Sequence, residues 1–224
     1  MSTRVAFKSK TGTEQHGELA EPTGSGKAPG IVLIQEYWGI NDNVRAWADR
    51  LAKEGFLTLA PDLYHGKSTK DPAEAAKLMQ SLDWPGAMAD IAGAAAFLKE
   101  HARGNGKVGV VGFCMGGALA FAAAANVAGL SAVVPFYGVP GQEIDVSRVT
   151  APIQAHFATR DEWAKPAIAE GIKERLAKVG KPMELFVYEA GHAFMNQHRP
   201  EAHDPASAKL AAERALTFLH AELG

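Results

Sequence analysis

The sequence of 224 residues contains a single cysteine, Cys114. A lone cysteine forms no disulfide within the chain and no zinc site of the Cys-x-x-Cys kind. No cluster of histidines and carboxylates has the spacing of a zinc site either. We therefore expect no metal site, and the lack of disulfides favours the cytoplasm as the compartment of the protein.

The sequence also lacks an excess of charge of one sign. It has 23 Lys and Arg residues against 25 Asp and Glu residues, and these charges are scattered. Such a chain has no positive field for the phosphates of nucleic acids or for anionic lipids. No apolar run approaches the ~20 residues of a transmembrane helix, and none follows the positive charges near the amino terminus. We expect no nucleic-acid partner, no membrane partner, and no export or anchoring signal.

Internal repeats and low-complexity segments are absent as well. The composition, with 47% hydrophobic residues, is that of a globular chain. The only linker-like stretch, residues 21–27, has too little chain before it for a separate domain, so we interpret it as a loop. We predict one domain over residues 1–224, as a monomer or a small homo-oligomer.

Apolar runs of strand length recur along the chain, with Ala-rich segments of helical spacing between them. The predicted strands are residues 30–34, 56–60, 108–112, 130–136, 153–157 and 183–188, and the helices with clear start signals are residues 44–54, 73–82 and 206–219. Runs that are apolar on both faces are typical of a parallel sheet covered by helices. Residues 4–7 and 16–20 alternate more weakly and suit an antiparallel hairpin at the edge. The pattern predicts an α/β fold with a mostly parallel central sheet and helices on both faces.

The chemistry concentrates after the predicted strand 108–112. Gly112-Phe113-Cys114-Met115-Gly116 is the nucleophile elbow G-x-S-x-G with Cys in place of Ser, and the helical run 118–125 follows at once. The glycines let neighbouring backbone pass close to a sharp turn, and a helix amino terminus favours a thiolate. The alternative, a small buried hydrophobic cysteine, explains neither glycines nor turn. We predict the α/β-hydrolase fold with Cys114 as nucleophile.

An acid and a base should follow the nucleophile in chain order, each on a loop after a later strand. Asp161 follows the predicted strand 153–157, and His192 follows 183–188. Asp161 is equally suited to cap a helix, and His198 and His203 remain alternative bases. Position along the chain favours His192 as the base and Asp161 as the group that orients it.

The strand predicted over residues 30–34 ends in Gln35-Glu36-Tyr37-Trp38-Gly39. The loop after this strand commonly supplies one oxyanion N–H, which we assign to Tyr37, and the second comes from Met115. Glu36 would then point at the elbow, with its pKa raised by burial or as acceptor of the thiol proton. The alternative is a buried carboxylate paired with Arg or Lys.

Several motifs together resemble the dienelactone hydrolase family, cysteine enzymes of the α/β-hydrolase fold, over nearly the whole chain. They are Gln35-Glu36-x-x-Gly39, Pro61-Asp62-Leu63-Tyr64, Gly112-x-Cys114-x-Gly116-Gly117, Tyr137-Gly138 and Glu189-Ala190-Gly191-His192-x-Phe194. The resemblance implies a Cys114–His192–Asp161 triad and a Glu36 that meets the thiol in the resting enzyme. It implies a carboxymethylenebutenolidase-like hydrolase that cleaves a small ester or lactone through a thioester. The reaction needs only water, so we expect no cofactor.

The chain departs from the family where the substrate carboxylate binds. The resemblance implies two arginines there, yet this chain has Asn196 four residues after the histidine and no arginine between Arg50 and Arg103. Without that clamp, a neutral substrate, or one held by Lys67 or Lys70, fits better. The candidate substrate-binding residues are Trp38, Tyr64, Phe194 and Asn196.

Three other functions compete with hydrolysis. A redox or stress sensor would use Cys114 as a reactive thiolate, but the chain has no second cysteine for resolution. A glutamine-amidotransferase-like enzyme would carry a His-x-Glu pattern, which is missing near the end of the chain. A non-catalytic binding module on the same fold leaves the nucleophile, base and acid pattern unexplained.

Overall fold

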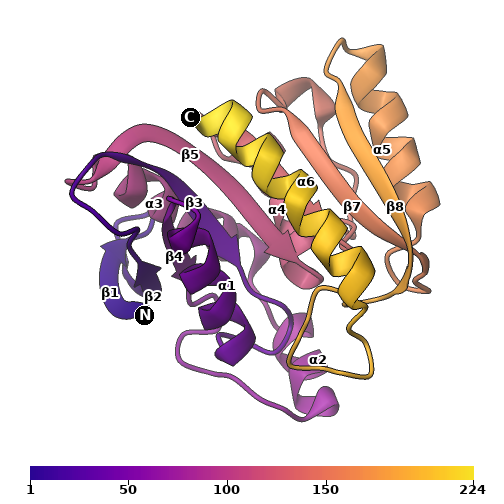
Figure 1. Cartoon of the computed structure of the whole chain (residues 1–224), viewed down its shortest axis with the longest axis horizontal. Helices are drawn as coiled ribbons and strands as arrows, with labels where there is room; N and C mark the ends of the chain where they lie inside the picture. The colour runs from indigo at the N-terminus through magenta and orange to yellow at the C-terminus, as the bar shows by residue number, and fades with distance from the viewer.

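Eight strands form one sheet in the computed structural model, which describes residues 1–224 (Figure 1). The strands are β1 (Thr3–Lys8), β2 (Glu14–Ala20), β3 (Ala28–Ile34), β4 (Leu57–Pro61), β5 (Gly104–Phe113), β6 (Ala132–Phe136), β7 (Ile153–Arg160) and β8 (Met183–Gly191). Their order in the sheet is β1-β2-β4-β3-β5-β6-β7-β8. Strands β3 to β8 pair in parallel, whereas β1 and β2 form an antiparallel edge hairpin. The predicted fold class is confirmed, including the antiparallel edge.

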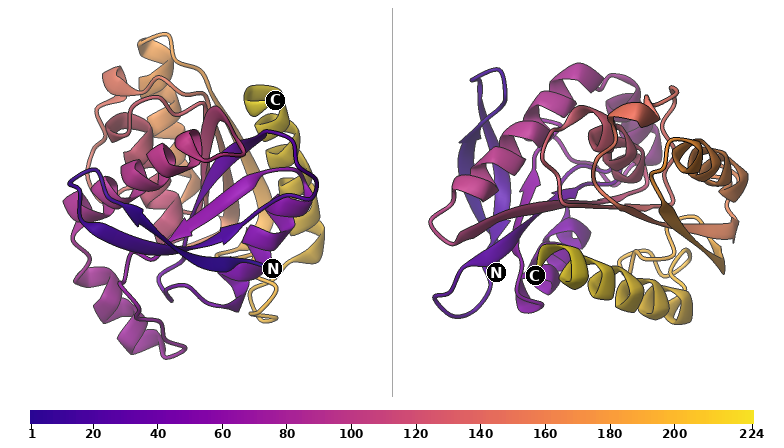
Figure 2. Two further views of the ribbon diagram at one scale, coloured as in Figure 1. Left: turned by 90° about the vertical axis from the view of Figure 1, so that its left-hand side faces the viewer. Right: turned by 90° about the horizontal axis from the view of Figure 1, so that it is seen from above.

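Helices cover both faces of this sheet. They are α1 (Asp42–Lys53), α2 (Pro72–Gln80), α3 (Trp84–Glu100), α4 (Met115–Asn126), α5 (Pro166–Lys178) and α6 (Pro205–Leu223). Figure 2 shows α6 on one face and α3, α4 and α5 on the other, and α1 lies on the same side as α6. None of these helices combines the length and the apolar composition that crossing a membrane requires.

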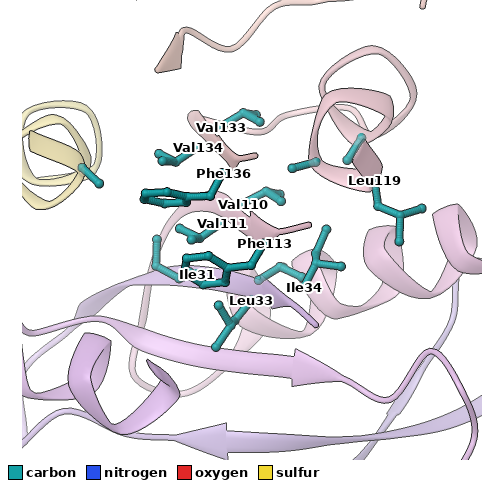
Figure 3. Close-up of a cluster of buried hydrophobic side chains, with 14 of the residues drawn as sticks. Ile31, Leu33, Ile34, Val110, Val111, Phe113, Leu119, Val133, Val134 and Phe136 are labelled. Atoms are coloured by element: carbon teal, nitrogen blue, oxygen red, sulfur yellow. The ribbon is translucent and has the colours of Figure 1, made fainter. Parts of the chain in front are cut away.

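The core lies between the sheet and its helices. Every residue of β3, β4 and β6 is buried, which explains why their sequences are apolar on both faces. Figure 3 shows Ile31 and Leu33 of β3 beside Val111 of β5, with Phe113 and Phe136 next to them. The rings of Phe113 and Phe136 stack with centroids 4.8 Å apart. This packing fixes the carboxyl ends of the central strands relative to one another.

Helix α3 was not among the predicted elements. Its residues are largely Ala and Gly, seven of them are buried, and the side chain of Asp83 makes no capping hydrogen bond at its start. A helix buried on several sides has no clear polar face, so its period is hard to recognise from sequence. Gly93 shows how closely it packs, because a Cβ there would lie 2.6 Å from the Cα of Ser9.

Helix α5 begins at Pro166, after a short turn that follows β7. The sequence suggested a helix directly after Asp161. Instead, Asp161 Oδ1 accepts hydrogen bonds from the N–H groups of Trp163 and Ala164, both at 2.9 Å. Asp161 therefore closes a local turn and leaves its other carboxylate oxygen free for a partner from another loop.

Candidate active site

Cys114 lies between β5 and α4 in a backbone conformation that residues other than glycine rarely adopt, with φ 57° and ψ −117°. Neighbouring glycines make this turn possible. A Cβ at Gly112 would overlap the backbone of Gly116, and a Cβ at Gly116 would lie 2.7 Å from the carbonyl oxygen of Gln35. The Cys114 N–H donates to Phe136 O at 3.0 Å. The strained turn thus presents a half-buried thiol at the carboxyl edge of the sheet.

The structure brings the three residues expected to act together into one hydrogen-bonded chain. His192 Nε2 lies 3.2 Å from Cys114 Sγ, and His192 Nδ1 lies 2.6 Å from Asp161 Oδ2. Cys114 follows β5, Asp161 follows β7 and His192 follows β8, each directly. Their separation along the chain is bridged because parallel strands end at the same edge of the sheet.

The charges in this chain of contacts stabilise one another. Burial opposes a positive charge on His192, but its hydrogen bonds to Asp161 and Cys114 outweigh burial and raise the pKa of His192 to about 10. Burial also opposes a charge on Asp161, yet the hydrogen bond from His192 and two backbone N–H groups lower the pKa of that carboxyl. An ionised Asp161 beside a protonated His192 suits a thiol that must lose its proton.

The other histidines lie elsewhere. His156 is buried in β7, where its ring nitrogens lie 2.8 Å from the Tyr188 hydroxyl and 3.0 Å from Gln154 Oε1. His203 Nδ1 lies 2.9 Å from the carbonyl oxygen of Phe194. Neither His198 nor His203 lines the cavity that contains Cys114, so the geometry favours His192 over both alternatives.

Glu36 is buried beside this chain of contacts, but its partners are amides. Its Oε2 accepts hydrogen bonds from Asn196 Nδ2 at 2.6 Å and from Asn43 Nδ2 at 3.4 Å. The resemblance implied that Glu36 meets the thiol, whereas the hydrogen bond of Cys114 Sγ in this structure is with His192. Burial raises the pKa of Glu36 to about 7, although the positive charges of His192 and Arg199 and the two amide hydrogen bonds lower it.

The backbone N–H groups of Tyr37 and Met115 have no acceptor within the chain. Met115 is the first residue of α4, so its N–H has no intrahelical acceptor. The N–H of Tyr37 donates to no protein acceptor in the loop after β3. A pair of free N–H groups at an elbow is the arrangement that receives an oxyanion.

These groups open into a cavity of about 300 Å³. It is lined by Glu36, Tyr37, Trp38, Cys114, Arg160, Asp161, Glu162, Trp163, His192, Ala193 and Arg199. Among the predicted substrate-binding residues, only Trp38 lines this cavity. No three His, Cys, Asp or Glu side chains converge in the geometry of a metal site anywhere in the chain.

The other three predicted substrate-binding residues lie behind the cavity. Phe194 is fully buried against Tyr137, with ring centroids 5.3 Å apart. Tyr64 is buried, and its hydroxyl donates to Met115 Sδ at 3.1 Å. Asn196 contacts Glu36. A sequence shows that an aromatic residue flanks a motif, but the turn after the motif decides whether the ring faces the core or the cavity.

The sequence reasoning missed three residues at the mouth of the cavity. Trp163 is 68% exposed, and its ring lies 5.4 Å from that of His192. Arg160 contacts Glu189, and Arg199 lies over the Trp38 ring at 5.4 Å. A large exposed aromatic two residues after Asp161 was a readable signal. The positive charge sought in Lys67 and Lys70 is instead supplied at this cavity by two arginines.

A model of the dienelactone hydrolase family matches residues 16–223. Protein usf of Aquifex pyrophilus is 35% identical over 229 residues, which cover 97% of this chain and 97% of that protein. Carboxymethylenebutenolidase 1 of Cupriavidus pinatubonensis is 31% identical over 232 residues, with 98% and 97% coverage.

Solved structures give the same fold. A dienelactone hydrolase-like promiscuous phosphotriesterase from metagenomic libraries superposes with a TM-score of 0.89 at 22% identity, covering 100% of this chain and 99% of that chain. The esterase Pf2001 of Pyrococcus furiosus has a TM-score of 0.70 at 20% identity, with 100% and 94% coverage. At such low identity these two similarities establish the architecture alone.

Proposed function

The chain belongs to the dienelactone hydrolase family and is an ester or lactone hydrolase, and we propose that it hydrolyses its substrate through a thioester on Cys114. The observation that carries this proposal is the hydrogen-bonded chain from Cys114 Sγ through His192 to Asp161, with contacts of 3.2 and 2.6 Å. With these contacts, the proposed nucleophile Cys114 lies within reach of its base His192, and the buried carboxylate of Asp161 orients that base.

In the first half of the reaction, the Cys114 thiolate attacks the acyl carbon, and the carbonyl π electrons move onto oxygen. The resulting oxyanion accepts hydrogen bonds from the N–H groups of Tyr37 and Met115. When the carbon–oxygen bond of the ester breaks, protonated His192 gives its Nε2 proton to the departing alkoxide. A thioester and an alcohol result; for a lactone both remain in one molecule.

In the second half, neutral His192 takes a proton from a water molecule as that water attacks the thioester carbon. The same two N–H groups stabilise the second oxyanion. Its collapse expels the Cys114 thiolate and releases the carboxylic acid, and His192 remains protonated by the proton taken from water. Asp161 keeps the imidazole oriented through both halves.

The cavity suggests a small substrate with a planar part. Its volume of about 300 Å³ is at the lower end of the range for small-molecule sites. Trp38 and Trp163 offer apolar faces for that planar part, while Arg160 and Arg199 put positive charge at the rim. The absence of the two family arginines favours a neutral substrate, whereas Arg160 and Arg199 favour a carboxylated one. Matched neutral and carboxylated esters therefore belong in the same assay.

The test is hydrolysis of short activated esters, and of neutral and carboxylated lactones, by the wild type and by Cys114→Ala. The proposal requires turnover in the wild type and a loss of at least ~1,000-fold in kcat/KM in the variant, as expected when a nucleophile is removed. Equal rates would overturn it. No turnover together with rapid, reversible oxidation of Cys114 would favour the redox sensor, the alternative that the half-buried free thiol supports.

A further inference from the structure

The buried carboxyl of Glu36 is held by two asparagines on opposite sides of the active site. Asn43 belongs to the first turn of α1, and Asn196 to the loop that follows β8. The exposed fractions of Glu36, Asn43 and Asn196 are 2%, 3% and 2%. Three polar side chains this deeply buried restrict one another, because each unpaired group would cost free energy.

Asn196 is itself fixed in orientation. Its Oδ1 accepts the His198 N–H at 3.0 Å, its backbone N–H donates to Ala193 O at 2.9 Å, and its carbonyl accepts the Arg199 N–H at 3.1 Å. Because Oδ1 already has a donor, the amide group that faces Glu36 is the NH₂. Asn196 therefore presents a donor to Glu36 at 2.6 Å from a rigid turn.

Cys114 Sγ and Glu36 share the cavity, and both lie near His192. Glu36 interacts with the positive charges of His192 and Arg199, and it faces Tyr137, which packs against His192 with ring centroids 5.2 Å apart. A Glu36 free to turn would compete with His192 for the thiol, since a carboxylate accepts a thiol proton as an imidazole does. Anchoring of Oε2 by the two asparagines would prevent this competition.

We propose that Asn196, assisted by Asn43, is a positioning residue that holds Glu36 away from Cys114, so that the resting thiol is paired with His192 before any substrate binds. The inference rests on the proposed function, because it concerns the same nucleophile. It assigns to Asn196 a role different from substrate binding, and it removes the need for Glu36 to move before the thiol is activated.

Asn196→Leu tests this anchoring, because leucine has a similar volume and no donor. The readout is the rate at which iodoacetamide alkylates Cys114 without substrate at neutral pH. In that reaction the thiolate forms a carbon–sulfur bond as the carbon–iodine bond breaks and iodide leaves. We expect Asn196→Leu to slow alkylation at least ~10-fold, and to lower kcat for an activated ester more than it changes KM.

Three further variants separate the loss of anchoring from general damage to the loop. In Asn196→Leu combined with Glu36→Ala, the competing carboxylate is gone, so the alkylation rate should return to within about threefold of the wild type. The matched control is His203→Ala, which removes a 2.9 Å contact with Phe194 O in the same loop without touching Glu36. This control should alkylate like the wild type. Asn196→Asp, which places a carboxylate against Glu36, should slow alkylation as well.

The inference is overturned if Asn196→Leu and Asn196→Asp, both folded by circular dichroism, alkylate at the wild-type rate. It is also overturned if the double variant stays as slow as Asn196→Leu, because the loss would then reflect a disturbed loop. Alkylation requires no ester, so this test is separate from the proposed function. A wild type that hydrolyses nothing but shows the expected alkylation pattern would refute hydrolysis alone.

Discussion

At the residue scale, burial disfavours the charged forms of both His192 and Glu36, but neighbouring groups compensate for burial fully at His192 and only partly at Glu36. Asp161 and Cys114 overcome it for His192, whose pKa rises to about 10, whereas amide hydrogen bonds and two cations only partly offset it for Glu36. The positive charge in the site is therefore held firmly at neutral pH, and the carboxyl of Glu36 titrates near neutrality.

The raised pKa of Glu36 makes stability depend on pH. Its pKa is about 7 in the folded chain against 4.5 as its usual value, so the folded state holds the proton more tightly. This contribution to stability is fully present below pH 4.5 and is lost as the pH rises through 7. For Glu36→Gln, the unfolding free energy relative to wild type should therefore increase by about 3 kcal/mol from pH 4.5 to pH 8.

Denaturant unfolding of both proteins at the two pH values measures this change. Other titrating groups cancel in the difference between variant and wild type. A difference that stays constant over this pH range would show that Glu36 has an ordinary pKa and is solvated or paired in solution.

Trp163 is the residue at the mouth that should select substrates. Its ring is 68% exposed beside His192, where a planar group of the substrate would lie against it. We expect Trp163→Ala to raise KM for an aryl ester roughly threefold to tenfold, in keeping with the free energy of one aromatic contact, and to leave KM for a small methyl ester unchanged.

Steady-state kinetics with the two esters measure this change in KM, and Trp163→Phe is the conservative control. An equal change for both substrates would mean that Trp163 shapes the loop and does not contact the substrate.

The residues of the site were predictable from sequence to different degrees. Cys114, Asp161 and His192 could be predicted because a short motif and chain order specify them, and in the structure His192 contacts both other residues. The amide contacts of Glu36 were not predicted. Asn196 was assigned to the substrate and Asn43 to no role, because both meet Glu36 only through the fold. Such contacts depend on side-chain directions that no local pattern encodes.

At the scale of single elements, the connection from β5 through the elbow to α4 is the most constrained part of the chain. Glycines occur there because the backbones of β3, α4 and the loop after β6 pass within contact distance. Helix α2, in contrast, projects from the molecule and has only Ala75 buried (Figures 1 and 2). The elements that flank Cys114 are thus closely packed, whereas the exposed helix α2 is not.

Two glycines in helices give a matched prediction. A Cβ at Gly116 in α4 would lie 2.7 Å from Gln35 O, whereas a Cβ at Gly171 in α5 would meet nothing within 4 Å. Gly116→Ala should destabilise the protein by more than about 2 kcal/mol and abolish turnover, because the loop carrying Glu36 and Tyr37 must move. Gly171→Ala should stabilise it by roughly 0.5 to 1 kcal/mol through helix propensity. Thermal unfolding of both variants tests the pair, and a tolerated Gly116→Ala would refute the close packing.

Element prediction succeeded where the pattern was strong. The strands were predicted because β-branched and aliphatic residues predominate in β3, β4 and β6. Helix α3 was missed because Ala and Gly, at about half of its 17 positions, weaken the contrast between its faces. The alternative that Asp161 caps a helix is wrong, because α5 begins at Pro166 and Asp161 is used in a turn and in the contact with His192.

At the scale of the whole molecule, the parallel sheet is what assembles the site. The residues come from loops after β3, β5, β7 and β8, which are separated by as many as 160 positions between Glu36 and Asn196. Because these strands run in parallel, all four loops emerge at one edge, beside the amino terminus of α4. The topology therefore explains why a sequence order of nucleophile, acid and base predicts a spatial cluster.

The central claim is that Cys114 carries the acyl group of the substrate, and mass spectrometry of a quenched reaction tests it most directly. The wild type is mixed with an activated acyl ester, quenched in acid during the first turnover, and mapped by peptide. We predict one added acyl group on the peptide containing Cys114, sensitive to hydroxylamine as a thioester is, and none in Cys114→Ala. Ester hydrolysis that proceeds with no acyl group on Cys114 at any time in the first turnover would contradict the account.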